Sequence, residues 1–440
     1  MKKFNSILAA LLVTLSANAE GYQVNSLSAS QVGMAHVGTG MKLGAESMHF
    51  NPAGMAFMED KLDFSIGASA VVPSATCTYS GTEYSNNSTV STPLYAYGAF
   101  SVNDKIKVGI SLTTPYGSSI DWGSNWAGAV LSQNVSLQAF SLQPTIAWKI
   151  TDKLSIGAGA IISWGSVELE KGLVSASSMN MVLAAQGSEY SFGDTTPASV
   201  QLSGSSKVSV GYNVGAMYDI TDKLTVGASF RSEMGLKVEA GDAKLIYAKD
   251  NDMAQLLLGT TLDAMDNSQF EAEMPMPYNL TLGTSYQLTS RLLLAFDAQL
   301  TGWSAYDVLN INFLGDELTA YNQSLEKNYS NSWAFRIGAE YALNKSIDLR
   351  AGFYYDQSPV NSEYYNPETP SMDKISPSFG FSYRPTANIS IDVACAYIHG
   401  LGADDASYTY TDTLLETETT FTANYSVSAW NPTLGISYSF

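Results

Sequence analysis

Long runs in which apolar and polar residues alternate are the feature that most limits how this chain can fold. One run covers residues 140–150 and another covers 154–164, with an apolar residue at almost every second position. Similar runs cover 208–220 and 278–288. Successive side chains of a β-strand point to opposite faces, so each run predicts a strand with one apolar face and one face of small or polar residues.

The length of the runs decides between two architectures built from such strands. Strands of soluble β-sandwiches are mostly about 5–6 residues long, whereas these runs extend over about 10–16 residues, which suits strands that cross a bilayer at a tilt. The polar faces also carry charged residues such as Lys107, Asp297 and Glu340, which a dry sandwich core does not tolerate. We therefore predict an all-β protein, a transmembrane antiparallel β-barrel with its apolar faces towards lipid.

A short polar motif recurs between pairs of runs and predicts tight hairpin turns. It occurs at residues 103–106, 151–154, 221–224, 289–292 and 344–347, with a looser copy at 385–389. The other connections are long and irregular, and short turns at one end with long loops at the other are typical of bacterial outer-membrane barrels. About six turns and about seven loops join about fourteen strands, which places both ends of the barrel on the periplasmic, short-turn side.

The two ends of the chain indicate export to the outer membrane. Lys2 and Lys3 precede the apolar residues 7–15, and Ser16-Ala17-Asn18-Ala19 supplies a cleavage site of the A-x-A type. Residues 1–19 are therefore predicted to be a secretory signal peptide. The last run closes on Phe440, and a terminal aromatic residue after an alternating strand resembles the signal read by the outer-membrane assembly machinery.

Residues 20–59 differ from the rest of the chain, because they lack strand alternation and are rich in Gly, Ala, Ser and Met. An eight-stranded barrel is filled by its own side chains, but a barrel of about fourteen strands leaves a channel. A plug would hold back small solutes. We therefore divide the mature chain into an N-terminal hatch, residues 20–59, that lies in the lumen, and a barrel wall, residues 60–440.

Composition argues against several classes of function. The chain has 22 Lys and Arg against 41 Asp and Glu, so it lacks the basic patch of a nucleic-acid-binding protein. It contains no G-x-S-x-G motif and no Cys/His spacing of a zinc site. No catalytic residue, metal site or cofactor is predicted. Cys77 and Cys395 are expected to be unpaired, with Cys395 facing lipid.

Short motifs occur along the chain in a distinctive order. The mature chain opens with Gly21-Tyr22-Gln23-Val24-Asn25, and the hatch ends with Phe50-Asn51-Pro52-Ala53-Gly54-Met55. Further motifs are Gly33-Met34-Ala35, Gly38-Thr39-Gly40, Pro115-Tyr116-Gly117, Gly302-Trp303-Ser304, Asp356-Gln357-Ser358-Pro359-Val360 and Tyr397-Ile398-His399-Gly400. Together they resemble the FadL-type (OmpP1/FadL/TodX) family of outer-membrane transporters for long-chain fatty acids and other hydrophobic compounds. The resemblance spans nearly the whole mature chain.

The resemblance implies passive uptake of long-chain fatty acids or similar hydrophobic compounds. Extracellular loops capture the ligand, a pocket above the hatch receives it, and it leaves sideways through the barrel wall after the hatch moves. Two loops carry apolar residues suited to capture: Met179, Val182, Leu183, Met253, Leu256 and Leu257. Exposed apolar segments usually bind something, and Met adapts to flexible chains. The alternative is that the two loops only pack on each other.

Two motifs are candidates for the moving parts. Pro115-Tyr116-Gly117 is expected to end the third strand, because Pro removes a ladder hydrogen bond and Gly weakens a strand. The resemblance implies a lateral opening at this kink, and a simple turn from strand to loop is the alternative. Asn51-Pro52-Ala53 is expected to form a rigid turn in which the Asn51 side chain bonds to nearby backbone. A purely structural plug turn is the alternative there.

The head group of the ligand is the least determined part of this prediction. Members of the family hold the fatty-acid carboxylate with basic residues of the inner wall, but the corresponding positions here are Ser166 and Asn310. Arg231 and Arg336 are the candidate substitutes, since Arg suits carboxylates. The alternative is that they pair with wall carboxylates, Glu340 or Asp219. The sequence therefore predicts a hydrophobic ligand and leaves its head group open.

We expect a monomer surrounded by outer-membrane lipid and lipopolysaccharide, without a nucleic-acid partner. Two rival functions follow from other classes of barrel. A general diffusion porin or purely structural barrel would have no hatch, and a membrane-embedded hydrolase would need a nucleophile beside a base.

Overall fold

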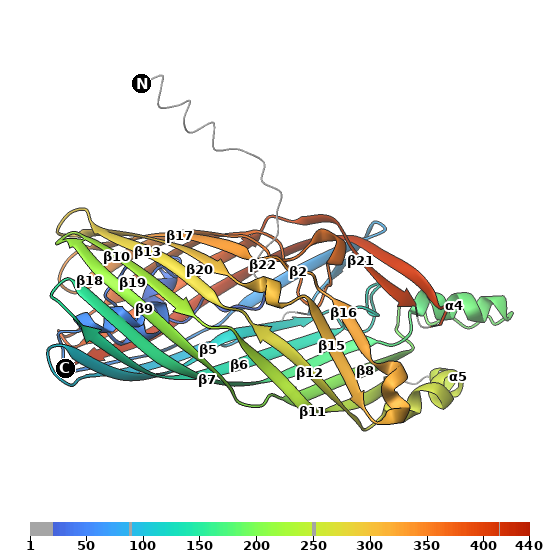
Figure 1. Cartoon of the computed structure of the whole chain (residues 1–440). Helices are drawn as coiled ribbons and strands as arrows, with labels where there is room; N and C mark the ends of the chain where they lie inside the picture. The colour runs from blue at the N-terminus through green and yellow to red at the C-terminus, as the bar shows by residue number, and fades with distance from the viewer. Residues whose placement is uncertain (1–20, 88–89, 249–251, 413) are drawn as a thin grey trace, which may run out of the picture.

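The structure of the protein is a computed structural model that describes residues 21–87, 90–248, 252–412 and 414–440. The predicted signal peptide, residues 1–19, lies outside the described residues. Figure 1 shows an elongated barrel with the C-terminus and the short turns at one end and long loops at the other.

Every strand pairs antiparallel with its neighbours, and β22 (Thr417–Ser439) closes the ring by pairing with β1 (Leu62–Ser69) and β2 (Val72–Tyr79). The next strands are β3 (Thr82–Ser85), β4 (Leu94–Ser101), β5 (Ile106–Asp121), β6 (Asn134–Lys149), β7 (Leu154–Gly172), β8 (Ala198–Ser205), β9 (Ser209–Thr221), β10 (Leu224–Arg231), β11 (Met234–Tyr247) and β12 (Ser268–Met276). They continue with β13 (Asn279–Gln287), β14 (Leu292–Thr301), β15 (Val308–Leu314), β16 (Gln323–Glu326), β17 (Ser332–Ala342), β18 (Ile347–Asp356), β19 (Lys374–Tyr383), β20 (Ile389–Gly400) and β21 (Ala403–Asp412).

Several wall strands bend and are divided into two consecutive segments, as in β8 with β9 and β10 with β11. Taken together, the described segments make the predicted antiparallel barrel of 14 strands. No helix among the described residues has both the length and the apolar character needed to cross a membrane.

The alternation in the sequence sets the two faces of the wall. Ile156 of β7 and Leu434 of β22 are 40% and 54% exposed on the outside, whereas Ser155 and Asn213 are completely buried on the inside. The prediction that the apolar faces point outward is therefore confirmed. The outer face suits lipid, and the inner face of small and polar residues meets whatever fills the lumen.

The recurring motif forms the short turns, as predicted. In the first turn the Asn103 Oδ1 atom accepts hydrogen bonds from the backbone N–H groups of Lys105 and Ile106, both at 2.9 Å. The Thr151 Oγ1 atom does the same for the backbone two and three residues later, at 3.2 and 3.0 Å. Thr221 and Thr289 repeat this pattern. A side-chain acceptor at the start of the turn satisfies backbone donors that the tight bend removes from the ladder.

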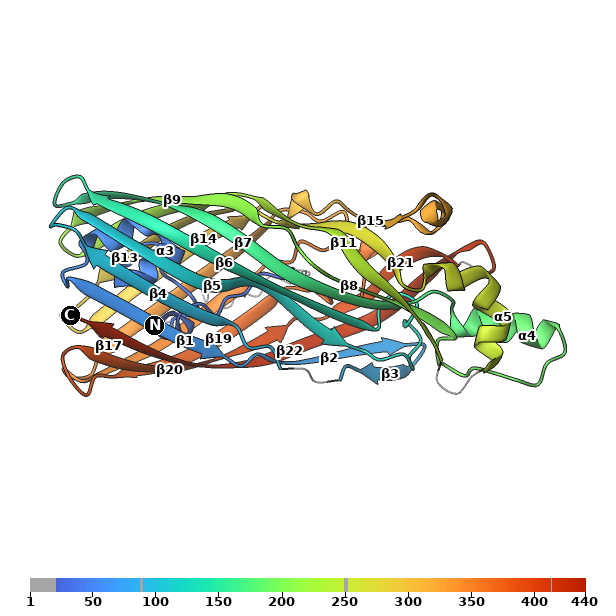
Figure 2. The same ribbon diagram turned by 90° about the horizontal axis from the view of Figure 1, so that it is seen from below.

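The extracellular loops are shorter than expected, because several strands continue beyond the apolar band. Residues 239–269 and 401–420 are two of the long connections that lack alternation in the sequence and were expected to be loops. The strand β11 nevertheless runs to Tyr247, and the pair β21–β22 extends through much of the second connection. Beyond the bilayer the outer face meets water, so the alternation fades while the backbone ladder continues. The remaining loops contain α4 (Ala176–Ala185) and α5 (Asp252–Leu262), which project from the same end of the barrel in Figure 1 and Figure 2.

The hatch fills the lumen at the short-turn end, where Figure 1 shows it in blue. Its elements are α2 (Ala29–Val32), η1 (Gly44–Glu46), α3 (Ser47–Phe50) and η2 (Pro52–Phe57). Further 3-10 turns in the loops are η3 (Asp263–Met265), η4 (Trp303–Ala305), η5 (Asp316–Tyr321) and η6 (Ser362–Tyr364).

Glycines of the wall make room for the hatch. A Cβ atom at Gly157 of β7 would lie 2.4 Å from the carbonyl carbon of Pro52, and one at Gly215 of β9 would lie 2.1 Å from Asn51 Oδ1. Other wall glycines face the hatch in the same way: Gly227, Gly283, Gly338, Gly352 and Gly380. The small residues on the inward face of the strands therefore reflect close approach of the plug backbone to the wall.

Candidate functional site

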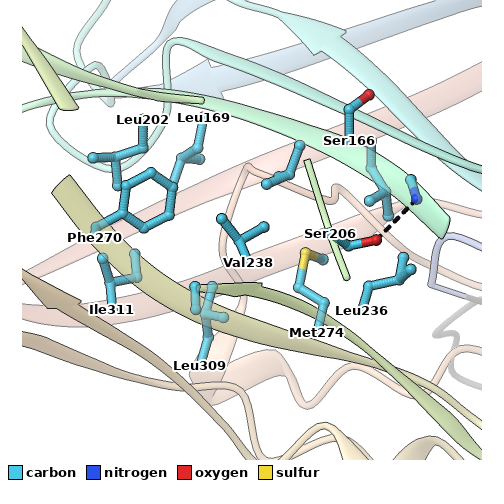
Figure 3. A pocket seen from close by; sticks show the side chains of 14 residues that line it. Ser166, Leu169, Leu202, Ser206, Leu236, Val238, Phe270, Met274, Leu309 and Ile311 are labelled. Atoms are coloured by element: carbon cyan, nitrogen blue, oxygen red, sulfur yellow. Dashed lines mark hydrogen bonds between the residues drawn. The ribbon is translucent and has the colours of Figure 1, made fainter. Parts of the chain in front are cut away.

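An apolar cavity, called here the inner cavity, lies between the wall strands above the hatch. Its volume is about 40 Å³. Figure 3 shows its lining as a ring of side chains from strands far apart in the sequence. The lining residues are Leu137, Gly165, Ser166, Val167, Leu169, Leu202, Ser206, Leu236, Val238, Phe270, Ala272, Met274, Leu309 and Ile311.

The inner cavity arises where inward positions change from small and polar to apolar. Along β7 the inward face carries Ser155 and Gly157 near the hatch, but Val167 and Leu169 farther along. The sequence analysis missed this site, because it followed the alternation of β7 only as far as residue 164. The change of character at inward positions is the signal that would have found it.

A second, larger space, called here the outer cavity, lies at the loop end and has a volume of about 1180 Å³. Leu257, Leu258 and Leu262 of α5 line it together with Met265 of η3 and Lys171 of β7. The outer cavity therefore combines apolar loop residues with a basic side chain. Its lining is mixed, because polar residues such as Gln323, Ser324 and Thr409 line it as well.

The six predicted capture residues do not share one environment. Leu257 lines the outer cavity, and Leu256 beside it is 76% exposed. Met179 and Leu183 of α4 are buried, at 3% and 4% exposed, while Val182 and Met253 are half-buried. Only Leu257 among them contributes to either cavity, so α5 rather than α4 faces the candidate route.

The motif Pro115-Tyr116-Gly117 does not end the third strand, which corrects the sequence-based expectation. The strand β5 continues to Asp121 in register with β6, after a shift of register between Thr113 and Tyr116. The predicted length of this strand is too short, because pairing with β6 alone is enough to keep the backbone of β5 extended beyond Pro115. The disturbance is instead a bulge, which bends the strand locally.

The wall is interrupted on the other side of this bulge. Among the described residues, the ladder between β4 and β5 ends at the pair Tyr95–Thr113, and β5 meets the preceding segment again only at the bridge Asn87–Asp121. The free edge of β5 binds the start of the hatch instead. The Val24 N–H donates to the Pro115 carbonyl and the Gly117 N–H donates to the Tyr22 carbonyl, both at 2.9 Å.

An aromatic cluster holds the start of the hatch at this interruption. The Tyr22 ring makes edge-to-face contacts with Trp303 at 4.9 Å, Tyr306 at 5.9 Å and Tyr116 at 6.2 Å between ring centroids. The Tyr22 hydroxyl donates to the Pro275 carbonyl, next to Met274 of the inner cavity. Residues 22–24 are thus held at the interrupted part of the wall.

Asn51 connects the hatch to the wall at its other side. The Asn51 Oδ1 atom accepts a hydrogen bond from the Ala53 N–H at 3.1 Å, and Nδ2 donates to the carbonyls of Thr39 at 2.9 Å and Ala216 at 3.0 Å. The side chain is completely buried. The expected turn is therefore present, and Ala216 belongs to β9, so the same side chain also binds the wall.

Glu46 is a buried carboxyl group between the hatch and the wall. Its side chain accepts hydrogen bonds from the hydroxyls of Ser28 at 2.6 Å, Ser30 at 3.2 Å and Ser65 at 2.7 Å. Burial raises the pKa of Glu46 to about 7, although the bonds from Ser28 and Ser65 oppose the shift. The protonation state of this contact therefore changes near neutral pH.

Arg231 and Arg336 lie in the packing between hatch and wall, and neither lines the inner or the outer cavity. Arg231 contacts Gln143 and the backbone of His49, and Arg336 contacts Gln299 and Asn25. The wall carboxylates that were the alternative partners of these two arginines pair with other residues. Arg350 binds Glu340, and Lys42 binds Asp219. Of the two positions that correspond to the family's basic residues, only Ser166 lines the inner cavity. The other residue, Asn310, accepts a hydrogen bond from Ser324.

The two cysteines are free, with Cys77 buried and Cys395 half-buried. Within the described residues no group of three or more His, Cys, Asp or Glu side chains is placed to hold a metal ion.

Comparison with known proteins identifies the family. Residues 10–440 match the family model described as "Outer membrane protein transport protein (OMPP1/FadL/TodX)". The chain is 26% identical over 435 residues to Outer membrane protein P1 of Haemophilus influenzae, with 91% of each chain covered. It is also 26% identical over 412 residues to the long-chain fatty acid transport protein of Escherichia coli, covering 89% of this chain and 90% of that protein.

Solved structures show the same fold. A FadL homologue of Pseudomonas aeruginosa superposes with a TM-score of 0.79 at 19% identity, over 96% of this chain and all (100%) of that chain. The toluene transporter TodX of P. putida gives a TM-score of 0.69 at 19% identity, over 94% and 99% of the two chains. The resemblance, the outer-membrane location and the assignment to transport rather than catalysis are thereby confirmed. The chain belongs to the OMPP1/FadL/TodX family of outer membrane transport proteins.

Proposed function

We propose that this protein carries long-chain fatty acids or similar hydrophobic compounds passively across the outer membrane. The observation that supports this best is the position of the inner cavity. It is lined almost entirely by apolar side chains, and Leu137 of its lining is paired with Ser118 of β5, in the stretch where the described residues show no ladder between β4 and β5. A porin needs a wet channel, whereas an apolar molecule gains about 25 cal/mol for each Å² of surface that leaves water.

The proposed route has three stages. A ligand enters the outer cavity against the apolar residues of α5, including Leu257, and moves along the lumen into the inner cavity. Residues 22–24 of the hatch then release the free edge of β5, and the ligand passes sideways between β4 and β5 into the membrane. This sideways exit means that the ligand does not have to pass the hatch or enter the water on the periplasmic side.

Related proteins support the ligand class. One relative is named a long-chain fatty acid transport protein, and one structure of the same fold is of a toluene transporter. Both names describe ligands that are largely apolar. We therefore propose that the ligand of this chain has a largely apolar body, whatever its head group.

The experiment is to lock the hatch onto β5. Gln23 and Tyr116 are opposite each other in an antiparallel bridge flanked by two hydrogen bonds. Such pairs have Cα atoms about 4.5 Å apart, within the range that a disulfide spans. The double variant Gln23→Cys, Tyr116→Cys, made without the native cysteines, should take up labelled long-chain fatty acid only after reduction.

A matched control places the cross-link elsewhere in the wall. Ala339→Cys with Ala351→Cys joins β17 to β18, which are already paired at that position, so oxidation should not change uptake. The proposal is wrong if the oxidised hatch variant transports as fast as the reduced one. It is also wrong if mass spectrometry finds no hydrophobic molecule in the purified protein and deletion leaves fatty-acid uptake intact.

A further inference from the structure

Lys171 lies at the boundary between the two cavities. It is two residues beyond Leu169 on the inward face of β7, where Leu169 lines the inner cavity and Lys171 lines the outer one. Its Nζ atom donates a hydrogen bond of 2.9 Å to Gln323 Oε1 of β16. Gln323 is paired with Ile311 of β15, which lines the inner cavity. The Lys171–Gln323 bond therefore spans the lumen immediately above the inner cavity.

Lys171 forms no ion pair with a neighbouring carboxylate. Among the described residues, no carboxylate lies within 4.0 Å of its Nζ atom. The nearby carboxylate of Glu368 forms its ion pair with Lys327, with side chains only 6% and 2% exposed, and it attracts Lys171 only through space. Lys171 thus presents a cation whose hydrogen-bond partner in the lumen is a neutral amide.

Three carboxylates also line the outer cavity, and they oppose an anionic ligand. Glu326, Glu363 and Glu418 are all exposed to solvent, so water and salt screen them. Lys171 is half-buried and directly above the inner cavity. A carboxylate that has passed the screened rim therefore meets the cation in a less polar environment, where attraction is stronger.

We propose that Lys171 is the head-group site of this transporter and makes it select amphipathic anions over neutral hydrophobic compounds. This rests on the proposed uptake of hydrophobic compounds. The ligand's carboxylate replaces the Gln323 amide at Lys171, and its apolar tail extends along the inner cavity. On β7 this path begins at Gly165 and ends at Lys171. The six residues between these ends rise about 3.3 Å each, so the path for the ligand is about 20 Å long.

The exchange of partners explains why the site gives selectivity. A neutral ligand must pass or break the Lys171–Gln323 bond without offering a replacement. A carboxylate breaks the same bond and replaces the neutral Gln323 amide by a charged acceptor, so that both partners of the new hydrogen bond are ionised. Arg231 and Arg336 cannot serve this purpose, because their groups are engaged with the hatch and outside both cavities.

The test compares two ligands of equal chain length, palmitate and hexadecanol, bound to the purified full-length protein in detergent at pH 8. Lys171→Met keeps the length of the side chain and removes its charge, whereas Lys171→Arg keeps the charge. We expect Lys171→Met to bind palmitate about ten- to hundredfold more weakly and hexadecanol as tightly as wild type. Lys171→Arg should stay within about threefold of wild type for both ligands.

A surface control and the possible outcomes make the test decisive. Lys207 is exposed and paired with Glu239 outside both cavities, so Lys207→Met should bind both ligands normally. The head-group proposal is overturned if Lys171→Met binds palmitate as wild type does, or loses both ligands equally. If wild type binds neither ligand, the proposed function itself fails, and the head-group proposal fails with it.

Discussion

Adding one methyl group to the barrel wall at Gly157 should loosen the hatch. The Cβ atom of Gly157→Ala would lie 2.4 Å from the Pro52 carbonyl carbon and 2.6 Å from the Ala53 nitrogen. Ordinary contacts begin near 3.4 Å, so the Pro52–Ala53 backbone must move by about 1 Å from the wall. The strand itself is held on both sides by the ladders to β6 and β9, so we expect the hatch to move rather than β7.

The size of the effect follows from the cost of overpacking. Forcing an extra carbon into a well-packed site costs about 1–3 kcal/mol. Because 1.4 kcal/mol is a factor of ten, the population of protein with a displaced hatch should rise by about five- to 150-fold.

The assay measures leakage and backbone exposure together. Proteoliposomes with Gly157→Ala should swell faster in a small sugar than those with wild type, and the Gly54 amide, which donates to the Asn51 carbonyl at 2.9 Å, should exchange its hydrogen faster. The control is Gly98→Ala in β4, whose Cβ atom would meet only the ring of Phe64 at 3.1 Å. Our account of the hatch contact is refuted if Gly157→Ala matches wild type, or the control, in both measurements.

Two further perturbations address the same contact between hatch and wall. Asn51→Ala removes three buried hydrogen bonds, those to the carbonyls of Thr39 and Ala216 and that from the Ala53 N–H. It should weaken docking of the hatch by about 2–5 kcal/mol, seen as faster amide exchange, whereas Ser30→Ala, which removes a contact within the hatch, should have a smaller effect. The pKa of Glu46 is about 7 in the folded protein, against an ordinary value of 4.5. Between these two pH values the folded protein holds a proton that a solvent-exposed Glu46 would lose. Docking of the hatch should therefore weaken by about 3 kcal/mol as the pH rises from 4.5 to above 7. Glu46→Gln should abolish this pH dependence of the opening free energy, measured by amide exchange corrected for intrinsic rates. A variant that kept the full dependence would assign it to groups other than Glu46.

The proposed path requires that the hatch be held firmly at one side and released at the other. Asn51 and the wall glycines fix the turn that follows α3, while residues 22–24 are bound to β5 by two backbone hydrogen bonds and aromatic contacts. In the proposed path, release of the second contact would open the interruption in the wall without unseating the first. The predicted leak of Gly157→Ala and the predicted block by the hatch disulfide test these two contacts separately.

The sequence alone was sufficient for the barrel. Alternation with a period of two is a local property of a strand, so the outward faces of β7 and β22 could be recognised without knowing their neighbours. The turns could be recognised as well, because each Asn or Thr bonds to backbone only two or three residues away. The presence of a hatch followed from a stretch without alternation in front of a wide barrel.

The tertiary structure decided where the chemistry lies. The course of β5 past Pro115 depends on its pairing with β6, and the partners of Arg231 and Arg336 lie on the hatch or on distant strands. Lys171 and Gln323 are separated by 152 residues in the chain yet meet across the lumen. Closing a sheet into a ring brings together side chains that no local pattern connects. The sequence therefore determined which face each strand turns inward, and only the closed barrel determined which inward residues form a cavity.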